Sequence, residues 1–281
     1  MNPFLQKAVA ALLAGAFVGW WGVRRGLLSK DGASMAGGTL ALIWMLGDWP
    51  WGAAALSYWL LYLLFAPFRR RAKAPLSDRH LPPMRIGWMP VAARMIWPLF
   101  LAVPVALGAR SSAILSAFVG AIAAGTADML GTELGLLSAQ RPRLITSWRH
   151  TQPGRPGGIS LLGLTASVGG AWLVGLTVLV AEGIIAWQAK VPVPRAMQWL
   201  PFGAMVGGTL ASLVDSFLGA TAQGLYYCER CDVLTESRWH HCGQRTEQIR
   251  GWPWLDNELV DFVSAVVGAA ITMTLVSWLA R

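Results

Sequence analysis

The chain has 281 residues, of which 55% are hydrophobic and 13% are charged, and it carries a formal net charge of +9. Soluble domains contain about a quarter charged residues, so this chain has too little charge to cover a water-exposed surface. The basic residues fall between apolar segments and not along one face, which argues against a nucleic-acid-binding protein. The composition predicts an all-α, polytopic helical membrane protein.

Eight apolar segments approach or reach the length needed to cross a hydrocarbon core of ~30 Å. In chain order they are residues 5–23, 33–48, 51–67, 90–108, 112–131, 160–187, 198–222 and 258–279. The second and third are short, so six or seven spans are the alternative counts. Residues 1–21 show no clear small-residue cleavage site, and we expect a retained first helix and not a signal peptide. We expect residues 1–281 to form a single integral membrane domain.

The distribution of basic residues supports eight helices. With the N-terminus outside, 18 of the 23 Lys and Arg residues fall on the inner side, as the positive-inside rule predicts. This topology predicts a multi-pass protein of the cell inner membrane whose polar, motif-bearing loops are cytoplasmic. The basic segment 69–73 is expected to touch anionic lipid headgroups, and the proline-rich segment 74–89 is expected to be irregular.

Acidic residues lie inside or beside several apolar segments. Asp128 falls within the fifth segment and Glu133 follows it, and carboxylates at membrane depth are costly and usually functional. In the seventh segment, small and polar residues recur at helical spacing on one face, namely Gly208, Ser212, Asp215, Gly219 and Gln223. The last segment begins with Asn257, and Asp261 lies one turn further along. We therefore expect these faces to meet protein or water and not lipid.

A glycine-rich turn precedes the sixth apolar segment. It contains Gly157 and Gly158 and ends at Ser160, and such a turn at the start of a helix can present backbone N–H groups to an anion. Arg149 and Arg155 add positive charge nearby. The turn is therefore a candidate phosphate-binding element.

Carboxylates near a phosphate-binding turn are typical of magnesium sites. Asp128 and Asp215 are the first candidates for Mg²⁺ ligands, followed by Glu133 and Asp261. Asp128 and Glu133 lie about 140° apart around a regular helix. They would converge only if the helix were broken at Gly131 or if other groups bridged them.

The segment 224–255, between the last two apolar segments, contains all three cysteines of the chain. Cys228 and Cys231 form a C-x2-C pair, followed by His240, His241 and Cys242, and this pattern fits a tetrahedral zinc site. The expected ligands are Cys228, Cys231, His241 and Cys242, although His240 is sterically easier to combine with Cys242. An unliganded polar loop is the alternative.

Several of these motifs together resemble a known membrane protein family. They are Arg25-Gly26, Ala127-Asp128, Glu133-Leu134-Gly135, Gly157-Gly158-Ile159-Ser160, Asp215-Ser216, and Asn257 with Val260. The chain is similar over nearly its whole length to the domain of unknown function 92 family, which includes transmembrane protein 19 and phytyl-phosphate kinase-like proteins. Met129 and Asp261 stand where that family usually has Thr and Asn.

The resemblance implies a prenyl-phosphate kinase. Such an enzyme would transfer a phosphoryl group, with Mg²⁺, from a nucleoside triphosphate (CTP or ATP) to a membrane isoprenoid phosphate at the cytoplasmic face. The expected catalytic residues are Asp128, Glu133 and Asp215. The expected substrate- or phosphate-binding residues are Lys30, Arg149, Arg155, Gly157, Gly158, Ser160, Ser216, Gln223, Asn257 and Asp261.

The residues alone leave other functions open. Arg24, Lys30 or Arg94 could hold the phosphate of the acceptor. A transporter or scramblase would also place acidic residues inside helices, but near the membrane midplane. A nucleotidyltransferase acting on a lipid phosphate would use similar acids. A non-catalytic protein that recruits a partner through its zinc loop is a further alternative.

Overall fold

The computed structural model describes residues 2–76 and 85–281. Its described residues form a helical bundle in which every expected apolar segment is a helix, which confirms the predicted fold class. The long helices are α1 (Pro3–Arg24), α2 (Lys30–Leu46), α3 (Trp49–Phe65), α5 (Trp88–Ala106), α6 (Ser112–Gly135), α7 (Leu161–Ala189), α8 (Arg195–Thr221) and α9 (Asn257–Leu279). Six are long and apolar enough to cross a membrane; α2 and α3 are shorter, with 17 residues each.

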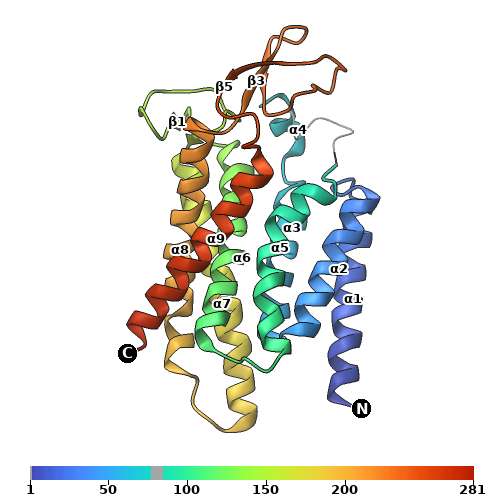
Figure 1. The fold of residues 1–281 in the computed structure, drawn as a ribbon, viewed down its shortest axis with the longest axis vertical. Helices are drawn as coiled ribbons and strands as arrows, with labels where there is room; N and C mark the ends of the chain where they lie inside the picture. Colours follow the sequence, from blue (N-terminus) through green and yellow to red (C-terminus); the bar gives the residue numbers. More distant parts are fainter. Residues whose placement is uncertain (1, 77–84) are drawn as a thin grey trace.

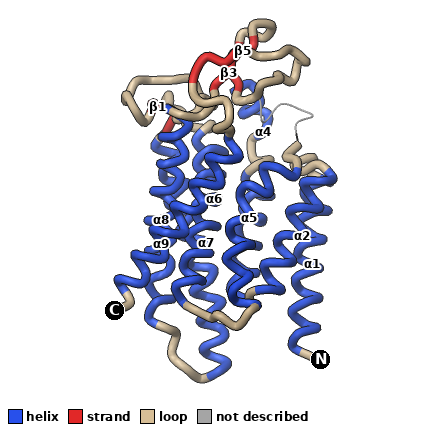
Figure 2. The backbone as a smooth tube through the Cα atoms, in the orientation of Figure 1, coloured by secondary structure: helices blue, strands red, loops and turns tan. Residues whose placement is uncertain are grey.

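The short elements gather at one end of the bundle, and both termini lie toward the other end (Figures 1 and 2). These elements are α4 (Arg70–Lys73), η1 (Ala74–Leu76), β1 (Arg143–Leu144), β2 (Gly158–Ile159), β3 (Leu225–Cys228), β4 (Val233–Thr235) and β5 (Glu247–Arg250). Strands β1 and β2 pair antiparallel, and β3 lies between β4 and β5 in a second antiparallel sheet. We call this end of the bundle, formed by residues 25–29, 66–76, 85–87, 136–160 and 222–256, the loop end.

Two ion pairs and a hydrogen bond at the opposite end involve basic residues that the charge count assigned to the outer side. Lys7 Nζ and Arg110 Nη2 lie 3.4 Å and 3.0 Å from the carboxylate of Asp48. Arg195 Nη1 donates to the carbonyl of Arg281 at 3.4 Å. Lys7, Arg110, Arg195 and Arg281 thus lie at the end where the charge count placed them, and the orientation in the membrane stays a prediction.

Helix α6 is the centre of the bundle, because 78% of the residues in its most apolar stretch are buried. It packs against α7, α8 and α9, and small residues let the backbones approach closely. A Cβ on Gly120 would lie 2.3 Å from the carbonyl oxygen of Gly268 on α9. On another side, Ser167 Oγ of α7 donates to the carbonyl of Ala127 at 2.7 Å. This close packing brings the polar faces of three helices together near the loop end.

The segment after α3 differs from the sequence-based prediction. Residues 74–76 form the short helix η1 where irregular chain was expected, and η1 directly follows α4 in the basic segment. Lys73 was expected at lipid headgroups, but its side chain is fully buried. Its Nζ donates to the carbonyls of Phe65 and Ala66 at 3.1 and 3.0 Å. Arg79 and the Pro82-Pro83 pair, included in the same predictions, lie outside the described residues.

The glycine contacts between α6 and α9 predict a difference between two substitutions. Gly120→Ala should lower the free energy of unfolding by about 1–3 kcal/mol, because the added methyl group would overlap a backbone carbonyl. Gly169→Ala on α7 is the matched control, since a Cβ there meets nothing within 4 Å. Thermal unfolding of both variants in one detergent would measure this. Equal midpoints would contradict the packing described for α6.

Candidate functional site

Three carboxylates converge at the loop end of the bundle. Asp128 of α6, Asp215 of α8 and Asp261 of α9 each place one oxygen within 4.8 Å of the others. They lie four to seven residues from the helix ends, or roughly 6–11 Å along the axes. The cluster is therefore closer to one membrane face than to the middle of a core ~30 Å thick.

An arginine from a fourth helix binds two of these acids. Arg94 Nη2 of α5 lies 3.3 Å from Asp128 Oδ2 and 3.1 Å from Asp261 Oδ1. When all are ionised, three carboxylates and one guanidinium have a formal charge of −2. Two carboxylate oxygens 4.8 Å apart repel by roughly 3–4 kcal/mol at an effective dielectric constant of ~20. A divalent cation would match the remaining charge, and carboxylates are suitable ligands for Mg²⁺.

Neighbouring polar groups orient the acids. Asn257 lies one turn before Asp261 on α9, and its Nδ2 donates to Asp261 Oδ2 at 3.0 Å. Ser264 Oγ donates to Asp215 Oδ2 at 3.3 Å and so links α9 to α8. Such outer hydrogen bonds hold metal ligands in position. The acidic cluster thus has the donor set and the support that a cation site requires.

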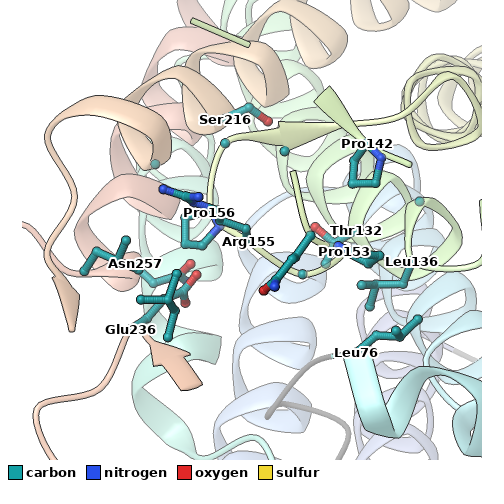
Figure 3. Close-up of a pocket in the computed structure, with 18 of the residues that line it drawn as sticks. Leu76, Thr132, Leu136, Pro142, Pro153, Arg155, Pro156, Ser216, Glu236 and Asn257 are labelled. Carbon is teal, nitrogen blue, oxygen red and sulfur yellow. The ribbon is translucent and has the colours of Figure 1, made fainter. Parts of the chain in front are cut away.

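Two of the acids, Asp128 and Asp215, line a cavity of about 920 Å³, a volume near the upper limit of typical small-molecule sites. Figure 3 shows Arg155, Asn257 and Glu236 on one side of it, with Thr132, Leu136 and Leu76 on another. Predicted site residues from four parts of the chain line the cavity. They are Asp128, Arg155, Gly157, Gly158, Ser160, Asp215, Ser216, Gln223 and Asn257. Residues far apart in the sequence therefore meet in one cavity, as predicted.

The glycine-rich turn contributes differently from the prediction. The N–H of Gly158 donates to the carbonyl of Arg155 at 3.0 Å, so it is already used within the turn. Ser160 caps α7, with its Oγ accepting from the N–H of Gly163 at 3.1 Å. Gly157 has φ +78°, and a Cβ there would lie 2.4 Å from that of Ala220. The turn therefore packs on α8 and starts α7 beside the cavity.

Two buried donors at the cavity wall are better candidates for contact with an anion. Arg155 Nε and Gln223 Nε2 are buried and have no hydrogen-bond partner among the described residues. Unpaired buried donors are costly and mark places where a ligand can bind. Two other predicted phosphate-binding residues lie elsewhere. Arg149 is exposed outside the cavity, and Lys30 lines a separate groove of about 720 Å³ between α1 and α2.

Glu133 is not one of the three clustered carboxylates, in agreement with its expected position about 140° around the helix from Asp128, and its catalytic role stays a prediction. Helix α6 continues without a break through Gly131 to Gly135, and the two carboxylates therefore point to different neighbours. Glu133 forms a salt bridge with the buried Lys73. We interpret this pair as a structural contact that ties α4 to α6.

Two residues have other partners than the sequence analysis predicted: Arg94, at the acidic cluster, and Lys73, in the contact between α4 and α6. Arg94 was a candidate for holding the acceptor phosphate, and instead it binds Asp128 and Asp261. A single basic residue inside an apolar segment was the available signal, because such a charge needs an acidic partner. Lys73 has no comparable signal, because it follows three arginines in a segment that resembles a membrane anchor.

A second group of metal-ligand residues lies in the loop-end sheet. Single ligand atoms of Cys228, Cys231, His240 and Cys242 all lie within 4.8 Å of one another. The structure thus brings in His240, which is buried, and not the exposed His241 of the predicted set. The hydrogen bond with His240, followed by that from the backbone of Gln244, lowers the pKa of the Cys242 thiol to about 6.

The fold and these two sites define a polytopic helical membrane protein with an acidic cavity at one face. The chain belongs to the integral membrane protein DUF92 family, whose model matches residues 13–269. Protein PGR of Arabidopsis thaliana is 33% identical over 171 residues, covering 59% of this chain and 57% of the relative. Uncharacterized membrane protein MJ0933 of Methanocaldococcus jannaschii is 32% identical over 130 residues, covering 46% and 48%. The chain thus aligns with about half the length of these relatives, and no solved structure matches it.

The Lys73–Glu133 pair predicts non-additive effects on stability. Lys73→Met should lower the free energy of unfolding by about 3–5 kcal/mol, because it leaves the Glu133 charge without this partner. The double variant Lys73→Met/Glu133→Gln should recover a large part of that loss. Denaturation of the single and double variants as a double-mutant cycle would measure the coupling. Simple additivity would show that the two side chains are not energetically coupled and would contradict the pairing.

Proposed function

We propose that this protein is a prenyl-phosphate kinase that transfers the γ-phosphoryl group of a nucleoside triphosphate to an isoprenoid monophosphate. The observation that carries the proposal is the convergence of Asp128, Asp215 and Asp261, two of which, Asp128 and Asp215, line a cavity that also contains Arg155 and Gln223 with their buried, unpartnered donors. The family resemblance supports the same activity. On this proposal the loop end is cytoplasmic, where the nucleotide is available and where positive charge is favoured.

The donor set fits Mg²⁺, with Asp128, Asp215 and Asp261 as its carboxylate ligands. When bound, Mg²⁺ would neutralise charge on the phosphoryl group during transfer. Arg155 and Gln223 would donate hydrogen bonds to phosphate oxygens from the cavity wall. Arg94 would hold Asp128 and Asp261 in place through its ion pairs.

The acceptor needs no general base, because a monophosphate is already anionic at neutral pH. The bond between the γ-phosphorus and the β–γ bridging oxygen breaks, and a bond from that phosphorus to an acceptor phosphate oxygen forms. The products are a nucleoside diphosphate and a prenyl diphosphate. Apolar residues of the same cavity, among them Leu136, Leu164 and Leu213, are available for the first part of the prenyl chain.

The position of the acids favours an enzyme over a transporter. A transporter would hold its acidic site near the midplane with access from both faces. Here the acids lie roughly 6–11 Å from the helix ends on one side. Asp128 and Asp215 share a cavity with the loop-end segments.

The direct test uses two differently labelled nucleotides. The purified protein would be incubated with Mg²⁺, a panel of prenyl monophosphates, and ATP or CTP labelled at either the α- or the γ-phosphate. We expect only the γ-label to appear in a lipid diphosphate. Transfer of the α-label would indicate a nucleotidyltransferase, and no labelled lipid from any acceptor would overturn the proposal.

The three acids predict matched losses of activity. Asp128→Asn, Asp215→Asn and Asp261→Asn should each reduce transfer by roughly 10²-fold or more, since each removes part of the charge that holds the cation. Glu182→Gln is the control, because Glu182 lies near the far end of α7 and should leave transfer unchanged. Initial rates at saturating Mg²⁺, in protein that elutes as wild type by size exclusion, would compare them. Wild-type rates in any of the three Asp variants would remove that residue from the site.

A further inference from the structure

The Cys/His cluster is built from two facing turns. Cys228 ends β3 and pairs with Val233 of β4, so the turn between these strands contains Cys231. The second turn is closed by the N–H of Gly243 donating to the carbonyl of His240 at 2.9 Å. It presents His240 and Cys242 to the first turn. Two turns that each supply two ligands are a common way to enclose a tetrahedral metal.

The distances fit zinc and exclude a disulfide. Cys228 Sγ and Cys242 Sγ are 3.6 Å apart, and His240 Nδ1 is 3.2 Å from Cys242 Sγ. Tetrahedral zinc with Zn–S of ~2.3 Å and Zn–N of ~2.0 Å would separate such atoms by about 3.8 Å and 3.5 Å. A disulfide requires about 2.05 Å between sulfurs, and all three cysteines are free.

The protein supplies all four ligands of a tetrahedral metal, which is typical of a structural site. Cys228 and His240 are buried, and three sulfurs and one nitrogen complete a tetrahedron. A catalytic zinc instead keeps one position open for water or substrate. A metal bound here would hold chain segments together, as structural zinc does.

The same turns form one wall of the cavity above the acids. Cys231, Thr235 and His240 line the cavity. Arg250, at the end of β5, donates from Nη2 to the carbonyl of Gly219 at 2.6 Å and also binds the carbonyl of Ala220. The sheet is thereby anchored to the end of α8. The two far turns meet through the hydrogen bond from Arg230 Nη1 to the carbonyl of Cys242 at 3.2 Å and through the Cys/His cluster.

The geometry points to one structural Zn²⁺ bound by Cys228, Cys231, His240 and Cys242, which fixes the wall of the cavity formed by residues 228–242. This inference goes beyond phosphoryl transfer and does not depend on it. The acidic cluster and the Cys/His cluster have different ligand chemistry. Zinc would select the thiolates, and Mg²⁺ would select the carboxylates.

The test measures metal content and ligand type in the full-length protein. Elemental analysis should give one Zn per chain, and Co²⁺ exchanged into the site should show the visible bands of tetrahedral cobalt and strong thiolate charge-transfer bands. Each Cys→Ser variant should reduce the charge-transfer intensity by about one third, because three thiolates are ligands. His240→Ala should weaken metal retention, and His241→Ala is the matched control that should keep it.

Hydrogen exchange on the wild-type protein tests the effect on the wall without relying on a variant that folds. Chelation of zinc should speed exchange in residues 228–242 and leave α6 and α8 unchanged. Absence of bound metal, loss of metal in His241→Ala with retention in His240→Ala, or unchanged exchange after chelation would each overturn the inference.

Discussion

Three acids inside the membrane bundle require positive charge at the same place. One carboxylate oxygen each of Asp128, Asp215 and Asp261 lies within 4.8 Å of the others. Arg94 supplies part of this positive charge through ion pairs to two of the acids. A bundle of this composition gains little from burying carboxylates, and each one removed from water carries a large desolvation cost. Under the proposed function this cost is offset by cation binding, and the cluster does not serve folding stability.

The packing of α6 makes this convergence possible. Glycines at positions such as Gly120 and Gly268 allow α6 and α9 to approach at backbone distance, and Gly208 lets α8 approach the backbone of α6 at Ala123. With three helices this close, their polar faces meet near the loop end. The segment 142–160 and the β3–β4 turn then cover the acids and form a cavity.

Much of the fold could be predicted from the sequence because apolar length and charge asymmetry are local signals. Every expected apolar segment is a helix, and helical spacing correctly placed Ser212, Asp215, Gly219 and Gln223 on one cavity-lining face. Pairing between distant residues has no such signal. Lys73 is bound to Glu133 sixty positions away, and that pairing depends on how α4 folds back on α6.

The choice between adjacent residues was only partly predictable from the sequence. The predicted set named His241, although the steric argument favoured His240 beside Cys242, and the turn that ends at Gly243, with φ +81°, places the His240 ring against Cys242. The phosphate-binding turn shows the same limit. Its glycines are explained by contact with α8 at Ala220, and the unpartnered donors of Arg155 and Gln223 become visible only in three dimensions.

The central claim, that three acids from three helices form one divalent-cation site, is tested most directly with Mn²⁺ in place of Mg²⁺. Electron paramagnetic resonance of purified protein, titrated with Mn²⁺ in the absence of nucleotide, would count bound ions and show their displacement by Mg²⁺. We predict one Mg²⁺-displaceable site that is lost in Asp215→Asn and Asp261→Asn and retained in Glu133→Gln. Equal Mn²⁺ binding by all of these proteins would contradict the account.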